Sequence, residues 1–464
     1  MNRFPHIRGP RMIRMAFFLC LVFLPVEIFA QAVRMGIEVD KPLNDTVFIG
    51  YYPGSADNMK EIESVTLRMG KGFLEKEKEF PQGIYFIRTG KMIFPFLMPS
   101  DQNFTLKINT LASTPSISAA GSAENQAFFD YLNLRPDSTE TNIEAEQQRL
   151  ASSWKESLLG KFMLALTEIQ IPEPPAELAG TVEEQIIRIQ WYTDHYFDHL
   201  DYADPDLLRT PVYDEYVKRY LEKVLPVFPD TIIARTDRML ERTRSNPEVF
   251  QHLASLLLNY YRNNSYVMAE NVWVHMAEKW FIPLAGEWKD SLMIADLSKE
   301  VSDRKLSRIG QQAPDMQLMT YSCKDFTGFK KGDSMPEGKP ASLKELFTAK
   351  INILFFWEAG CIHCLEAVPQ LQEQLKDFDA SKVKIIGILT SEYPEGVEKW
   401  AVFLNTPELC NWTHARSPGS SRYKWDYRIL TTPALYILDE NGQILIKNIE
   451  IEQTKDIVNM FLSL

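Results

Sequence analysis

The sequence feature that most constrains this chain is a pair of cysteines, Cys361 and Cys364, at a point where one hydrophobic pattern gives way to another. Residues 351–357 read INILFFW, which predicts a buried strand, and residues 361–378 have the apolar spacing of a helix. A strand that leads into a helix here places Cys361 at the helix amino terminus, where unpaired N–H groups and the helix dipole stabilise a thiolate. We therefore expect Cys361 to titrate below the usual thiol value of about 8.5. Cys364, one turn inward, is expected to be more buried and to stay protonated until it is needed.

The region around this pair, residues 308–464, alternates predicted strands with predicted helices. Asn441-Gly442 marks a hairpin turn between the last two strands. This order indicates a mixed sheet covered by helices on both faces, which is an α/β fold. The predicted strands are 351–357, 383–389, 431–438 and 443–449, and the predicted helices are 361–378, 395–404 and 452–462.

Two regions with different patterns precede this domain, so we expect a multidomain chain. Residues 31–123 contain short β-rich segments separated by turn formers, which predicts a small β-sandwich. Residues 124–307 change to helical periodicity punctuated by prolines, which predicts an α-helical middle domain. The β segments are 46–52, 83–88, 93–98 and 103–108, and the helical segments are 127–134, 148–166, 183–200, 212–225, 247–261 and 271–281.

One helical segment has a spacing that could bind a metal ion. His195 and His199 are four residues apart, and two histidines on one helix face can chelate a metal. The sequence DHYFDH places no glutamate between them, and the nearby Asp194, Asp198 and Asp201 are only speculative further ligands. The plainer interpretation is a solvated helix face, and we expect no metal site.

The first thirty residues have the pattern of a secretory signal peptide. Four arginines precede an apolar core at residues 15–24, and residues 28–30 offer a cleavage site. The alternative is an uncleaved amino-terminal anchor, which would be the only contact with a membrane. Cys20 follows the bulky Leu19, so we expect no lipid attachment. These features predict a protein exported to the periplasm.

Charge and cysteine content narrow the classes of function. The chain has a formal net charge of −12 and no basic block, which argues against nucleic acid as a partner. In an oxidising compartment, cysteines either pair or carry redox chemistry. Four cysteines follow the leader, too few for a disulfide framework in so long a chain, which favours a reactive dithiol. The other two, Cys323 and Cys410, could form a disulfide or pack unpaired as small hydrophobic residues.

The dithiol favours thiol–disulfide exchange, in which the first cysteine attacks a disulfide and the second resolves the mixed disulfide. A structural zinc site needs four ligands, so Cys323, Cys410 and His414 would have to converge on the pair. A peroxidase would want a hydroxyl side chain where Glu358 stands. His363, between the cysteines, is either a cation that stabilises the thiolate or a solvent-exposed residue without effect on it.

These motifs resemble those of the thioredoxin superfamily, specifically the exported TlpA/ResA-like thiol–disulfide oxidoreductases. Two segments carry the resemblance, GQQAPDMQL at 310–318 and FFWEAGCIHC at 355–364. Pro369 matches the proline that kinks the family's active-site helix. Thr432-Pro433 matches the family's cis-proline dipeptide.

The resemblance implies a thioredoxin-like fold for residues 308–464, protein substrates and no cofactor. It also implies a substrate-docking edge formed by Thr432 and Pro433, with Trp357, where substrate backbone pairs as a strand does. The whole chain is similar to exported redoxin proteins of Bacteroidota. Those proteins carry a β-rich domain and a helical domain, both of unknown function, before the thioredoxin-like domain.

Two departures from the family pattern affect the chemistry. Phe355 stands where thioredoxin holds a buried aspartate, and Gly360 replaces the tryptophan that usually precedes the first cysteine. Proton transfer to Cys364 therefore needs Glu358, Glu366 or water. The direction of electron flow stays open.

The sequence thus supports two functions. The first is an exported thiol–disulfide oxidoreductase that acts on protein disulfides and exchanges electrons with an upstream thiol–disulfide donor or acceptor. The alternative is a partner-binding protein of the cell envelope in which the thioredoxin-like domain is redox-silent or a scaffold. The alternative arises because the sequence assigns no chemistry to about two-thirds of the chain.

Overall fold

The computed structural model describes residues 33–463 except 43, 112–114, 135–139, 227, 265–267, 289, 407–408 and 420–421. The expected signal peptide, residues 1–30, lies outside the described residues. The chain divides into two compact units, one made of Met1–Tyr51 and Lys60–Ile143 and the other of Tyr52–Met59 and Glu144–Leu464. Within the described part, no helix is both long and apolar enough to span a bilayer.

The first unit contains two four-stranded sheets, with strand orders β4-β1-β7-β8 and β3-β2-β5-β6. Burial alternates along β4 and β7, as it does in strands with one face on a core. The β-rich prediction is confirmed, and strands β1, β3, β4 and β8 are additional to those that the sequence marked. The strands are β1 (Val33–Asp40), β2 (Thr46–Tyr51), β3 (Lys60–Thr66), β4 (Lys71–Lys76), β5 (Gly83–Thr89), β6 (Met92–Met98), β7 (Thr105–Asn109) and β8 (Ser116–Ala120).

Helix α1 (Ala123–Leu132) follows β8 and is fixed to the sheets by one buried side chain. The hydroxyl of Ser122 caps the helix by accepting a hydrogen bond from the backbone N–H of Asn125. The Asn125 amide then exchanges hydrogen bonds with both backbone groups of Leu97, at 2.8 and 2.9 Å. Because a buried amide must be hydrogen-bonded, this contact orients the helix on β6.

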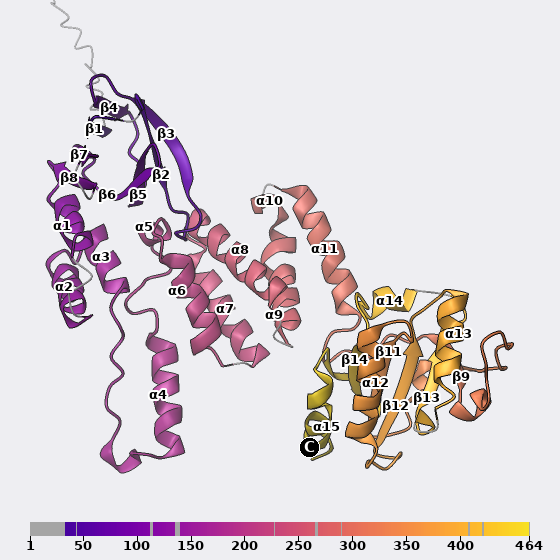
Figure 1. The fold of residues 1–464 in the computed structure, drawn as a ribbon. Coiled ribbons are helices and arrows are strands. Elements are labelled where there is room, and N and C mark those ends of the chain that lie inside the picture. The colour runs from indigo at the N-terminus through magenta and orange to yellow at the C-terminus, as the bar shows by residue number, and fades with distance from the viewer. Residues whose placement is uncertain are drawn as a thin grey trace, which may run out of the picture. The chain divides into compact units, whose positions relative to one another are not determined.

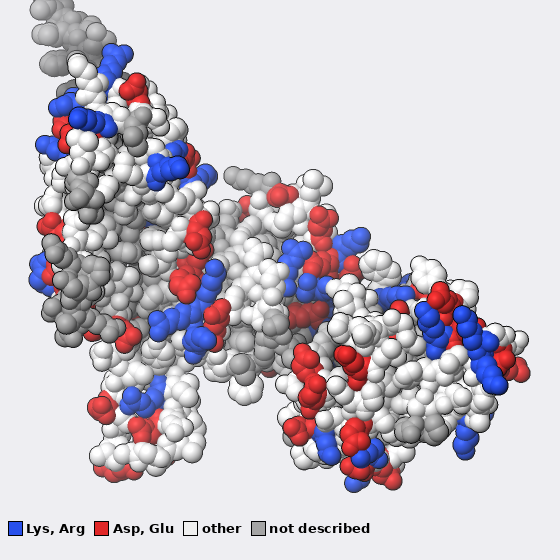
Figure 2. Space-filling model, viewed as in Figure 1, with Lys and Arg blue, Asp and Glu red and all other residues white. Residues whose placement is uncertain are grey.

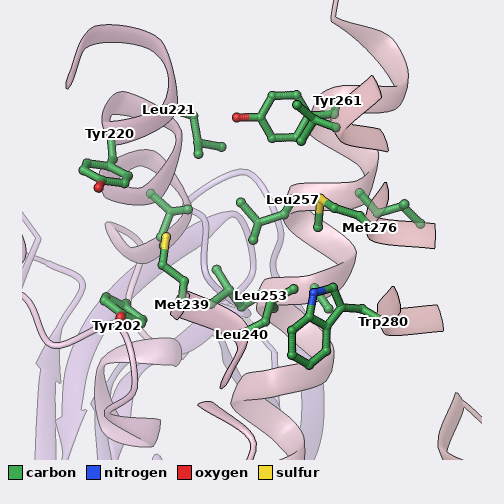
Figure 3. Close-up of a cluster of buried hydrophobic side chains, with 14 of the residues drawn as sticks. Tyr202, Tyr220, Leu221, Met239, Leu240, Leu253, Leu257, Tyr261, Met276 and Trp280 are labelled. Carbon is green, nitrogen blue, oxygen red and sulfur yellow. The ribbon is translucent and has the colours of Figure 1, made fainter. Parts of the chain in front are cut away.

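A layer of helices follows, and its core is shown in Figure 3. Side chains of α7, α8 and α9, among them Met239, Leu253 and Met276, point into one buried apolar cluster. The helices are α2 (Glu140–Ser153), α3 (Leu158–Ala165), α4 (Val182–His195), α5 (Pro205–Leu208), α6 (Tyr213–Arg219), α7 (Pro229–Thr243), α8 (Pro247–Asn263), α9 (Ala269–Met276), α10 (Ala285–Trp288) and α11 (Ser291–Lys305).

The single helix expected at 148–166 is two helices, α2 and α3. Ser157 caps the second by accepting a hydrogen bond from the backbone N–H of Gly160. A Cβ at Gly160 would overlap the carbonyl oxygen of Trp154, so the turn requires glycine here. Apolar periodicity continues through this break, which is why the pattern did not reveal it.

The carboxyl-terminal part, called the redox domain below (residues 308–464), is built on a seven-stranded sheet in the order β10-β9-β13-β12-β11-β14-β15. Strand β11 is parallel to β12 and antiparallel to β14, so the sheet is mixed as expected. The strands are β9 (Gln317–Tyr321), β10 (Lys339–Ser342), β11 (Ile351–Trp357), β12 (Val383–Leu389), β13 (Thr413–Arg416), β14 (Ala434–Asp439) and β15 (Ile444–Lys447), and the helices are α12 (Ile362–Leu375), α13 (Pro394–Phe403), α14 (Arg422–Asp426) and α15 (Thr454–Ser463).

Both faces of this sheet are covered. Alternate residues of β11 belong to two different buried clusters: Phe355 and Trp357 lie in one with α12, and Phe356 lies in the other with Tyr423 of α14. This explains why β11 reads as an unbroken apolar run, since a strand buried on both sides has no polar face. Figure 1 shows helices on either side of the sheet, and Figure 2 shows acidic and basic side chains interspersed over the visible face.

Candidate active site

The two cysteines lie where β11 passes into α12. Cys361 is the N-cap residue, with extended backbone dihedrals, and its carbonyl oxygen accepts the N–H of Leu365 at 3.1 Å. The Cys361 side chain is half-buried, whereas Cys364 is fully buried in the core under the helix. Both are free thiols. The Cys361 side chain is thus partly accessible to solvent, and the Cys364 side chain is not.

The surroundings of the two thiols drive their pKa values apart. Burial is the largest influence on Cys361 and raises its pKa, but hydrogen bonds from Cys364, Thr432 and the backbone of His363 together lower the pKa below its ordinary value. Burial raises the pKa of Cys364 well above the ordinary thiol value, and the neighbouring Cys361 raises it further. The pKa of Cys361 is therefore the lower of the two.

The loop before β14 faces the exposed thiol. The Thr432–Pro433 peptide bond is cis, and the sulfur of Cys361 lies 3.5 Å from the Thr432 carbonyl oxygen, to which the thiol donates. A groove of about 670 Å³ lies beside the pair and is lined by His363, Glu366, Thr432 and Pro433, among others. The structure thus brings these four sequence-predicted residues together around one cavity.

Glu358 directly follows β11 and is held by a residue that the sequence did not indicate. The hydroxyl of Thr390, which follows β12, donates to the Glu358 carboxylate at 2.9 Å. The backbone carbonyl of Glu358 accepts the N–H of Cys361 at 3.2 Å, and its backbone N–H is hydrogen-bonded to the sulfur of Cys364. At the thioredoxin aspartate position, Phe355 packs edge-on against Trp412 in the apolar core.

The other sequence-predicted site residues differ in how exposed their side chains are. His363 and Glu366 are exposed, and the backbone of His363 is among the groups that lower the pKa of Cys361. Trp357 is fully buried, with its ring edge-on to Phe403 at 5.3 Å. Its side chain therefore offers no surface to a substrate, so the structure contradicts its place in the docking edge. Strand β11 is buried on both faces, and this explains why a residue so close to the cysteines lies inside.

The two cysteines left open by the sequence form a disulfide, Cys323–Cys410, with a Cα–Cα distance of 4.9 Å. It joins the end of β9 to the segment before β13, strands that pair antiparallel. The zinc alternative has no support here, because these two sulfurs are bonded to each other and His414 is buried against the Leu409 carbonyl.

The histidine pair of the helical region does not share a helix, because α4 ends at His195. His195 hydrogen-bonds Asp198 at 2.7 Å, and His199 contacts the hydroxyl of Thr167 at 3.0 Å. Among the described residues, no cluster of three or more histidine, cysteine or acidic side chains could hold a metal ion.

Two parts of the chain match known protein-family models. Residues 309–446 match the model of the AhpC/TSA family, and residues 137–292 match a domain of unknown function, DUF5106. The chain is 26% identical over 174 residues to the thioredoxin-like protein YneN of Bacillus subtilis, covering 36% of this chain and 88% of YneN. It is 29% identical over 126 residues to the protein DipZ of Mycobacterium bovis, which covers 26% of this chain and 17% of DipZ.

Solved structures that match this chain include a thioredoxin-like protein from Bacteroides caccae, with 17% identity, a TM-score of 0.45, and coverage of 64% of this chain and 99% of that one. Another is the thioredoxin domain of a thiol–disulfide oxidoreductase from Bacteroides vulgatus, with 21% identity, a TM-score of 0.26, and coverage of 33% and 96%. The family match coincides with the sheet and the helix that carry the two cysteines. The redox domain of this chain is therefore a thioredoxin-like domain of the AhpC/TSA family.

Proposed function

We propose that this protein is an exported thiol–disulfide oxidoreductase that reduces or exchanges disulfides of protein substrates through Cys361 and Cys364. The observation that carries the proposal is the position of Cys361. Its sulfur is half-exposed at the amino terminus of α12, 3.5 Å from the Thr432 carbonyl, with a buried thiol one turn away. A thiolate in such a place is nucleophilic and reachable, as exchange requires.

The reaction balances within the dithiol and the substrate disulfide. The Cys361 thiolate attacks one sulfur of the substrate, the substrate S–S bond breaks, and the departing sulfur leaves as a thiolate that takes a proton. Cys364 then loses its proton and attacks the sulfur of Cys361, which releases the second substrate thiol. Two electrons have passed to the substrate, and the protein holds a Cys361–Cys364 disulfide. A thiol donor upstream must reduce that disulfide before the next cycle.

Export is supported by the leader pattern and by the Cys323–Cys410 disulfide, because structural disulfides persist in oxidising compartments. Cell fractionation of the full-length chain tests this part. We expect the protein in the periplasmic fraction with Gln31 as its first residue. Recovery from the cytoplasm with residues 1–30 intact would contradict export.

The exchange chemistry is tested with three variants and an insulin-reduction assay. Cys361→Ser should abolish turnover, whereas Cys364→Ser should accumulate a covalent adduct with the substrate, visible by mass spectrometry. A double variant, Cys323→Ser with Cys410→Ser, is the matched control and should keep turnover because it leaves the first pair intact. Full turnover by Cys361→Ser would refute the mechanism.

The reduction potential of the pair assigns the direction of electron flow. A value near −270 mV, on the order of that of thioredoxin, indicates a reductant, and a value near −120 mV indicates an oxidant. A dithiol that exchanges with glutathione no faster than a free surface thiol would favour the alternative, a partner-binding protein with a silent redox domain.

A further inference from the structure

The loop from Arg428 to Pro433 separates two hollows of different chemistry. One is the groove beside the cysteines. The other, about 510 Å³, is lined by Trp425, Ile429 and Leu430 together with the charged Glu392, Lys424 and Arg428, and by charged residues of α11. Arg428 and Leu430 line both hollows, so the two adjoin at this loop.

The apolar side of the second hollow is unusually exposed for its size. Trp425 is 71% exposed and Leu430 is 75% exposed. Large apolar side chains left in water at one place typically mark a surface that another molecule covers. Leu430 stands two residues before Thr432, whose carbonyl faces the reactive sulfur. Residues 431–433 of this loop form a bend with a cis peptide bond, so the extended geometry belongs to the substrate, in which side chains two residues apart point the same way about 7 Å apart.

The opposite wall comes from the helical region. Asp296, Lys299 and Asp303 of α11 line the hollow, and α11 lies beside α14 in Figure 1. The junction between these parts is held by buried charge. The Lys447 ammonium, 6% exposed, is 2.6 Å from the Glu270 carboxylate and donates to the Ser307 carbonyl at 2.9 Å. Because buried charges must be paired, this contact ties β15 to α9 and to the segment that follows α11.

We propose that the second hollow binds an apolar side chain of the disulfide-bearing polypeptide, two residues from the cysteine under attack, and that α11 thereby takes part in choosing the substrate. This inference rests on the proposed function and adds the substrate class. The occupant is an extended, disulfide-bearing segment, because the hollow adjoins the groove lined by Thr432, whose carbonyl oxygen lies 3.5 Å from the Cys361 sulfur. Its apolar residue would cover Trp425 and Leu430, while the charged wall of α11 limits the size of the side chain.

The test uses the full chain and two synthetic peptides, each carrying one cysteine in a mixed disulfide with glutathione. One peptide has leucine two residues from the cysteine on both sides, and the other has serine there. Hydroxyethyl disulfide, which has no side chain to place in the hollow, is the reference substrate. We expect kcat/KM for the leucine peptide to exceed that for the serine peptide about tenfold, the range for burial of one apolar group.

Variants test which residues cause the preference for the leucine peptide. Trp425→Ala removes the apolar wall and should bring the leucine-to-serine ratio close to one. Lys299→Trp, on an exposed position of α11, should fill the hollow and lower the same ratio. Tyr393→Ala is the matched control, because Tyr393 is 78% exposed in the same domain and lines neither hollow, so its ratio should equal that of the wild type.

Failure of the inference differs from failure of the proposed function. Equal rates on both peptides, with hydroxyethyl disulfide still reduced, would overturn the substrate class. A wild-type ratio in Trp425→Ala would overturn the site, and a wild-type ratio in Lys299→Trp would overturn the part assigned to α11. A wild-type protein that reduces none of the three disulfides would instead refute the oxidoreductase activity itself.

Discussion

His414 makes the stability of the redox domain depend on pH. The residue lies on β13, is fully buried, and has Nε2 3.0 Å from the Leu409 carbonyl oxygen. Trp412 lies against one face of its ring. Burial lowers the pKa of His414 from 6.5 to about 4, although the bond to Leu409 opposes this shift. The neutral imidazole is therefore the form that the fold accommodates.

The direction in which stability changes with pH follows from proton binding. Between pH 6.5 and 4 the unfolded chain binds a proton at this residue and the folded chain does not, so the stability is complete above pH 6.5 and is lost as the pH falls. One unit of pKa difference corresponds to about 1.4 kcal/mol. The pKa of His414 thus implies a loss of about 2 kcal/mol by pH 5 and somewhat over 3 kcal/mol well below pH 4.

The measurement is guanidinium unfolding at pH 7 and pH 5. Because a chain with several domains need not unfold in one step, the unfolded fraction should be read locally, by pulse hydrogen exchange at one fixed pH on peptides that cover β12 and β13. The wild type and His414→Gln are compared. The drop in unfolding free energy between the two pH values should be about 2 kcal/mol larger in the wild type.

His363→Gln is the control, since it removes an exposed imidazole from the same domain and should keep the wild-type drop. An equal drop in His414→Gln and wild type would refute the argument, because the proton would then be taken up elsewhere. An NMR titration in which the His414 ring titrates near pH 6.5 would refute it independently.

Three further predictions concern the site and its support. The rate of alkylation of Cys361 by iodoacetamide should reach its plateau at a lower pH than the rate for a free thiol does, because hydrogen bonds to the sulfur favour the thiolate. Stopped-flow rates measured across pH check this, and a midpoint at or above about pH 8.5 would contradict it. Glu358→Gln should slow resolution of the mixed disulfide about 10²-fold because it removes a proton acceptor, and Thr390→Val should slow it about tenfold because the Glu358 carboxylate loses its hydrogen bond. Single-turnover quenching measures both rates, and unchanged rates would exclude a part for Glu358 in proton transfer. Glu270→Gln leaves Lys447 buried without its counter-ion and should cost about 3 kcal/mol, visible as a lower midpoint in calorimetry, whereas an unchanged midpoint would mean that the pair adds nothing.

The local features of the site were predictable from the sequence because they depend on residues close together in the chain. An apolar run followed by helical spacing was enough to place Cys361 at the start of α12 and Cys364 one turn inward. The strand at 383–389 and the Asn-Gly hairpin were equally local signals. Prediction was weaker for β9, β10 and β13, which have five residues or fewer and become strands by pairing with distant neighbours.

The sequence by itself determined the fold class and predicted the order of the domains and the pair of thiols proposed to carry the chemistry, because hydrophobic periodicity and cysteine spacing are properties of neighbouring residues. Only the tertiary structure decided that Cys323 bonds Cys410, that Trp357 is buried rather than exposed to substrate, and that α11 stands beside the loop at Thr432. Each of these depends on contacts between segments tens of residues apart. Such contacts are settled by packing and by the pairing of buried charges, which no local pattern encodes.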